Sequence, residues 1–98
     1  STMNIETPKI KSIISALESA EILGVDDYLI HSWGIGADEY DPALEFSYTD
    51  YDGLIFEFSF TWEEMENSVL FPGGFSLKDS EGETVDIHLY KLEAINIK

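Results

Sequence analysis

The fold is decided by residues 44–60, which read LEFSYTDYDGLIFEFSF. Before the central turn, Leu, Phe and Tyr alternate with Glu, Ser and Thr. After it, Leu54 and three phenylalanines alternate with Ile, Glu and Ser. A period of two is typical of a strand with one face in a core and one in water. Because the Asp-Tyr-Asp-Gly at 50–53 favours a tight turn, the stretch predicts a β-hairpin.

An amphipathic helix is expected ahead of the hairpin. Thr7 and Pro8 suit an N-cap and a first helical position, and apolar residues then recur at helical spacing. We therefore predict a helix over about 8–22, ended by Gly24 in the left-handed conformation. A strand over 28–33, closed by Gly34, is expected next.

The second half of the chain predicts a short helix and further strands. Thr61 followed by Glu64 fits a capping box, which indicates a helix of one or two turns over 62–67. Short strands are expected on both sides of the turn at 72–74. Alternation over 84–90 predicts a last strand that is central or well paired, with Leu92, Ile95 and Ile97 extending the apolar content.

These elements predict one α+β domain over residues 3–98. Its N-terminal helix packs on a mainly antiparallel sheet of four to six strands, with a short second helix near 62–67. A chain of 98 residues has room for one core. Ser1 and Thr2, which precede Met3, are expected to be an expression scar.

Negative charge is the most unusual property of the composition. Against 20 Asp and Glu the chain has five Lys and no Arg, a formal net charge of -15. Between Lys11 and Lys78 there is no lysine or arginine. That stretch contains the acids Glu18, Glu21, Asp26, Asp27, Asp38, Glu39, Asp41, Glu45, Asp50, Asp52, Glu57, Glu63, Glu64 and Glu66. Such a field disfavours DNA, RNA and anionic membranes and favours a cationic protein surface, with solubility or a halophilic surface as the alternative.

Patterns for catalysis are weak. The chain has no cysteine, which excludes disulfides and thiolate zinc sites and allows the cytoplasmic location that we expect. His31 and His88 lie in predicted strands without an orienting carboxylate nearby in sequence, so we interpret them as structural or surface residues. A histidine-based active site, should the two meet in space, is the minority alternative. We expect a protein that is not an enzyme.

Cofactor and metal motifs are incomplete. Gly34 and Gly36 begin a dinucleotide fingerprint, but Glu39 stands where its third glycine is required. The sequence at 50–53 resembles the start of a calcium loop, yet Ile55 and Thr61 stand where that loop needs glycine and glutamate. We therefore expect no cofactor and no metal, with weak calcium binding left as an alternative.

Acids interleaved with aromatics form the candidate partner-binding site. Tyrosine is a frequent anchor at interfaces, and neighbouring carboxylates complement Lys and Arg on a partner. The predicted contact residues are Asp38, Glu39, Tyr40, Asp41, Asp50, Tyr51, Asp52, Glu63, Glu64 and Glu66. For Trp62 and Tyr48 a place in the core is at least as plausible.

The sequence favours a small acidic inhibitor of a basic protein. A nuclease must present a positive cleft to phosphates, so a dense negative field on a small domain can block it. In size and charge the chain resembles small acidic immunity proteins, which makes the immunity protein of a bacterial nuclease toxin our first hypothesis. The alternative is a phage-encoded nucleic-acid mimic, an anti-CRISPR or anti-restriction protein. A small enzyme or metal-binding module is the third reading.

Overall fold

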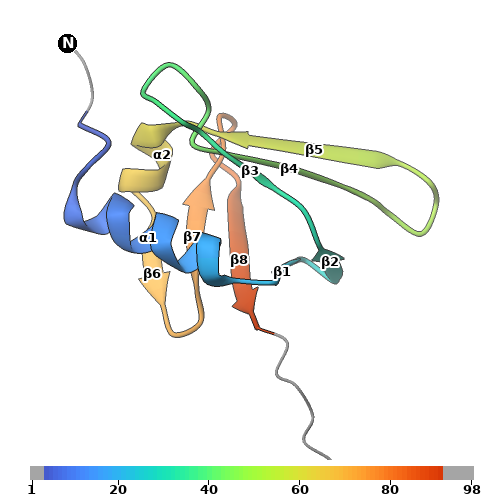
Figure 1. The fold of residues 1–98 in the computed structure, drawn as a ribbon. Helices are drawn as coiled ribbons and strands as arrows, with labels where there is room; N and C mark the ends of the chain where they lie inside the picture. Colours follow the sequence, from blue (N-terminus) through green and yellow to red (C-terminus); the bar gives the residue numbers. More distant parts are fainter. Residues whose placement is uncertain (1–3, 92–98) are drawn as a thin grey trace, which may run out of the picture.

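A computed structural model describes residues 4–91 of the chain (Figure 1). The elements follow in the order α1 (Pro8–Ser19), β1 (Ile22–Val25), β2 (Tyr28–Ile30), β3 (Gly34–Ile35), β4 (Leu44–Thr49), β5 (Ile55–Phe60), α2 (Trp62–Glu66), β6 (Val69–Phe71), β7 (Gly74–Lys78) and β8 (Thr84–Tyr90). The segments 1–3 and 92–98 lie outside the described residues. They contain the expected scar at Ser1 and Thr2 and the apolar residues Leu92, Ile95 and Ile97.

The strands form two antiparallel sheets. One has five strands in the order β2-β1-β8-β7-β6, and the other has three in the order β3-β4-β5. The α+β class, the N-terminal helix and the short second helix are confirmed, and the five-stranded sheet agrees with the expected strand number. The separate three-stranded sheet was not predicted. Strand β8 pairs with both β1 and β7, which confirms its predicted central position.

Helix α1 begins as predicted but ends three residues early. The Thr7 hydroxyl accepts from the Ile10 N–H at 3.2 Å, and Pro8 occupies the first turn. The predicted end at Ile22 is wrong because Ile22–Val25 form a fully buried strand, where pairing with β8 outweighs helical periodicity. Gly24 therefore caps no helix. A Cβ on it would lie 2.8 Å from Cε2 of Tyr90, so glycine makes room for that ring.

The predicted hairpin is confirmed, with Phe46 opposite Phe58. In its turn the Asp50 N–H donates to the Leu54 carbonyl at 2.8 Å, and Gly53 has φ 85°, a conformation that glycine adopts without strain. The core face ends sooner than predicted, since Leu54 is 59% exposed and Phe56 41% exposed. These two residues lie near the turn of the hairpin and do not belong to the apolar core.

The strand predicted over 28–33 is also shorter. Strand β2 stops at Ile30, and Gly34 begins β3 instead of closing β2. The backbone leaves the five-stranded sheet between these residues and enters the three-stranded one. A change of sheet leaves no mark in the composition, so the aromatic and β-branched residues of 28–33 predicted one continuous strand.

One apolar core joins the two sheets and both helices. Leu17 of α1, Ile87 of β8, Phe60 of β5 and Met65 of α2 belong to the same buried cluster. The predicted capping box of α2 is present, because Thr61 and Glu64 exchange bonds of 3.0 and 2.8 Å. No helix within residues 4–91 is long and apolar enough to cross a membrane.

Candidate partner-binding surface

The hairpin of residues 44–60, here called the arm, extends from the rest of the molecule (Figure 1). Stacked aromatic rings stiffen its inner face. The ring centroids of Phe46 and Phe58 lie 4.9 Å apart, and those of Tyr48 and Phe56 lie 5.3 Å apart. Tyr28 of β2 stacks on Tyr48 at 4.4 Å, which supports the arm from below. The arm therefore presents its surface groups on a preorganised frame.

Tyr48 also fastens the arm through a hydrogen bond. Its hydroxyl donates to the Asp26 carboxylate at 3.0 Å, in the turn between β1 and β2. Burial, the hydrogen bond to Asp26 and the charge of that carboxylate together raise the pKa of Tyr48 to about 12. The phenol consequently stays protonated near neutral pH and keeps its role as a donor.

Four of the predicted contact residues meet at the base of the arm. Glu39, Tyr40, Asp41 and Glu63 line a hollow of about 420 Å³, and we call these four residues the base cluster. The loop that carries the first three is held because the Trp62 indole N–H donates to the Asp38 carbonyl at 3.0 Å. Tyr40 is 84% exposed, as an interface anchor requires.

Asp38 itself supports this loop. Its carboxylate accepts from the Tyr40 N–H at 2.9 Å, and the Asp41 carboxylate accepts from the Ala37 N–H at 3.1 Å. Both side chains remain exposed while they hold the loop. The base cluster is thus a fixed set of carboxylates around an exposed tyrosine.

A second group of predicted residues lies at the opposite end of the arm. Asp50, Tyr51 and Asp52 form the turn, here called the tip. The Asp50 carboxylate accepts from the N–H groups of Asp52 and Leu54 at 2.9 and 2.8 Å, so it stabilises the turn. Tyr51 is 88% exposed. The length of β4, roughly 17 Å at about 3.4 Å per residue, separates the tip from the base cluster.

Glu64 and Glu66 are engaged within the fold. Glu64 closes the capping box, and Glu66 accepts from the Thr7 hydroxyl at 2.6 Å. The second bond ties the start of α1 to the end of α2. Through these hydrogen bonds both residues stabilise the fold. That they also contact a partner stays a prediction.

The outer face of the arm contains an acidic hollow that the sequence reasoning missed. It measures about 780 Å³, and its side chains include Glu45, Ser47, Glu57, Ser59 and Trp33. We call these five residues the acidic hollow. The pairs Glu45–Ser59 and Ser47–Glu57 lie opposite each other across the two strands, so both carboxylates share one face. The alternation in the sequence predicted that these residues of the hairpin face solvent. The register of the predicted hairpin could have shown which of them lie opposite each other.

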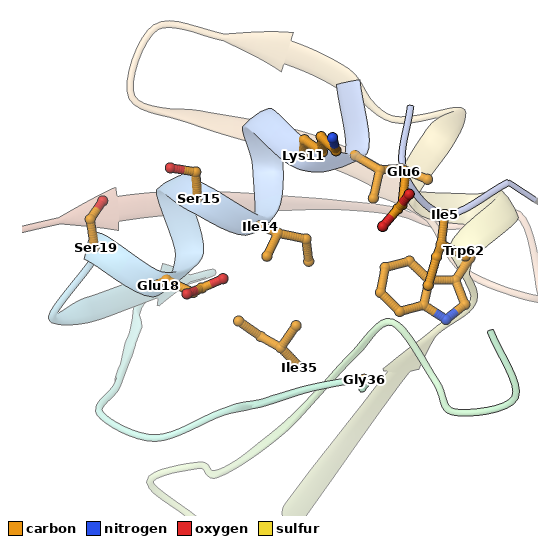
Figure 2. Close-up of a pocket in the computed structure, with 11 residues that line it drawn as sticks. Ile5, Glu6, Lys11, Ile14, Ser15, Glu18, Ser19, Ile35, Gly36 and Trp62 are labelled. Carbon is orange, nitrogen blue, oxygen red and sulfur yellow. The ribbon is translucent and has the colours of Figure 1, made fainter. Parts of the chain in front are cut away.

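Another hollow lies between α1 and β3, with a volume of about 530 Å³ (Figure 2). Its apolar lining includes Ile14, Ile35 and Trp62, and Figure 2 shows Ile14 and Ile35 on facing sides of it. Glu18 and Lys11 are on its border. Glu6 lines it as well, so two carboxylates and one lysine surround this apolar hollow.

The histidines do not form a shared site. Strand β1 lies between β2, which precedes His31, and β8, which carries His88. The His88 ring packs instead against Phe71, with centroids 5.2 Å apart. Within the described part of the chain, no group of three or more His, Asp or Glu is placed to hold a metal ion.

Comparison with known proteins identifies no relative: no family model, curated protein or solved structure matches the chain.

Proposed function

We propose that this protein is a small acidic inhibitor that binds and neutralises a basic protein, in particular the immunity protein of a bacterial nuclease toxin. The observation that carries the proposal is the acidic hollow, where Glu45 and Glu57 share one face of the hairpin. Two carboxylates on one face suit a lysine or arginine side chain, because the cation can pair with both of them.

The position of the hollow adds to this argument. It lies along the arm between the tip and the base cluster, so a partner on the outer face meets carboxylates along the whole hairpin. The sequence from Glu18 to Glu66 has no lysine or arginine to compete for them. A partner with a positive cleft is therefore attracted at long range and then anchored by side chains.

A nuclease fits these requirements, since its substrate cleft must be positive to hold phosphates. Occupation of that cleft by the arm blocks substrate without any chemistry by the inhibitor. The proposal includes a cytoplasmic location, where a toxin directed at cellular nucleic acid acts.

The test begins with capture of the partner from the source cells and its identification by mass spectrometry. Affinity is then measured by calorimetry between about 0.01 M and about 1 M salt, over which the screening length falls from about 30 Å to about 3 Å. We expect a steep loss of affinity and inhibition of the partner's nuclease activity. Affinity that is independent of salt, or a partner that keeps full activity when bound, contradicts the proposal.

A matched pair of charge variants locates the surface. Glu45→Gln with Glu57→Gln removes two charges from the acidic hollow. Glu81→Gln with Glu83→Gln removes two exposed charges from the turn between β7 and β8. We expect the first pair to weaken binding at least about tenfold and the second to change it much less, because close charge pairs carry the larger coupling energies.

A nucleic-acid mimic from a phage, an anti-CRISPR or anti-restriction protein, is the second candidate. It is favoured by the succession of base cluster, acidic hollow and tip, which distributes carboxylates along one elongated element. Gene neighbourhood separates the candidates: a toxin gene directly upstream supports immunity, and a defence-evasion cluster supports mimicry. Inhibition of a Cas or restriction enzyme in place of a toxin would decide for the mimic.

A further inference from the structure

Strand β5 is an open sheet edge. In the described residues it pairs with β4 alone, and its other side has no strand. At six residues it is longer than the other edge strands, since β2 and β6 have three residues each and β3 has two. Proteins usually protect such an edge with proline, lysine or a bulge. The sequence IFEFSF of β5 contains neither proline nor lysine.

The backbone groups on this edge can be assigned from the ladder. The Leu54 carbonyl accepts from Asp50 at 2.8 Å and the Phe60 carbonyl accepts from Ala43 at 2.8 Å, so both point toward β4. Orientation alternates along an antiparallel strand. The N–H and C=O groups of Ile55, Glu57 and Ser59 therefore point away from β4, toward solvent.

We propose that an extended segment of the basic partner adds to β5 as a further strand. This inference rests on the proposed function and specifies how the partner is held. Backbone hydrogen bonds to Ile55, Glu57 and Ser59 would supply affinity, as in other cases of strand addition. Glu57 belongs to the acidic hollow, so lysine or arginine side chains of the added strand lie beside it.

On its opposite face, the added strand needs apolar side chains. Phe56 and Phe58 project to the inner face of the arm, and Phe56 is 41% exposed. Apolar side chains beside these rings would bury surface that is now in water. The fitting segment consequently alternates basic and apolar residues.

A second copy of this chain fits the edge poorly. Antiparallel pairing of two β5 strands centred on Glu57 places the two Glu57 carboxylates directly opposite each other, which is destabilising. Each copy also carries a net charge of -15. Charge complementarity therefore selects a basic segment over self-association.

The experiment uses the intact protein and a fluorescent peptide of alternating lysine and valine. A matched peptide carries N-methyl groups on the amides of one edge, which keeps its charge and removes its donors. Polarisation at low salt measures affinity, and amide hydrogen exchange by NMR measures protection along β5. We expect the methylated peptide to bind at least about tenfold more weakly, since it loses strand hydrogen bonds. We also expect the parent peptide to slow exchange at Glu57 and Ser59, while Phe58 keeps the protection that β4 already provides.

Equal binding of the two peptides, or binding without protection at Glu57 and Ser59, overturns strand addition and leaves the electrostatic proposal intact. Failure of the parent peptide to bind, when the captured partner binds with salt-dependent affinity, overturns it as well. Failure of the proposed function gives a different result, namely a captured partner whose affinity does not respond to salt.

Discussion

Trp62 offers the sharpest test of how the base cluster is held in place. Its side chain is 6% exposed, and its indole N–H donates to the Asp38 carbonyl at 3.0 Å. The change Trp62→Phe keeps an aromatic ring in the core and removes the donor. The loop at 38–41 then loses its bond to α2.

The magnitude follows from three contributions. Phenylalanine buries about 50 Å² less surface than tryptophan, which corresponds to about 1 kcal/mol at ~25 cal/mol per Å². The lost hydrogen bond adds about 1 kcal/mol, and the void left by the smaller ring adds up to ~1 kcal/mol. We expect the free energy of unfolding to fall by about 2 to 3 kcal/mol.

Urea denaturation followed by circular dichroism measures this loss, because a change of tryptophan alters fluorescence directly. With a denaturant slope near ~1 kcal/mol per M, the midpoint should fall by about 2 M. Trp33→Phe is the control: it changes the partly buried tryptophan of the acidic hollow, so it should reduce partner affinity with a smaller loss of stability. A Trp62→Phe protein that loses less than about 0.5 kcal/mol would refute the assigned role of the indole bond.

Three further changes test the local structure. Thr61→Ala removes half of the capping box and should lower the free energy of unfolding by about 1 kcal/mol, measured by urea denaturation. Thr61→Ser should restore most of this stability, and an alanine variant as stable as the parent would contradict the cap. The pKa of Tyr48 is about 12 in the folded protein, above the ordinary tyrosine value of 10.0, so the unfolded chain loses this proton first. The free energy of unfolding should therefore fall as pH rises from about 10 to about 12. A pH titration of Tyr48→Phe should lack that fall, and an unchanged slope would refute it. Gly53→Ala, at φ 85°, should lower the free energy of unfolding by about 1 kcal/mol. Gly34→Ala, with no atom within 4 Å of the added Cβ, should leave it nearly unchanged. Thermal denaturation compares the two variants, and equal effects would contradict the strained turn.

The sequence patterns predicted those elements that depend on residues close together in the chain. The hairpin at 44–60 and the capping box at Thr61 depend on residues that lie close together in sequence, and both were found. The end of α1 was missed because Ile22–Val25 form a strand only through partners as distant as Tyr90. Periodicity within a short window contains no information on such a partner.

In the candidate site, too, residues close together in sequence could be grouped correctly, and residues brought together by strand pairing could not. Residues adjacent in sequence, such as Glu39 to Asp41 or Asp50 to Asp52, do lie together. The sequence could not show that β4 separates these two groups. Nor could it show that Trp33, Glu45 and Glu57 line one hollow, because that depends on how β3 pairs with β4.

The central position of β8 has a consequence for how the protein is made. Strand β1 near the start of the chain and β7 near its end are both completed by β8, with Ile22 opposite Tyr90 and Lys78 opposite Thr84. The strand pairing of the arm uses only residues 44–60 and its supports at Asp26 and Tyr28 precede it, so the arm can form during synthesis, whereas the five-stranded sheet must wait until Tyr90 has left the ribosome. Closing that long loop is entropically expensive and late. A nascent chain of this protein therefore displays its acidic arm before it has a finished core.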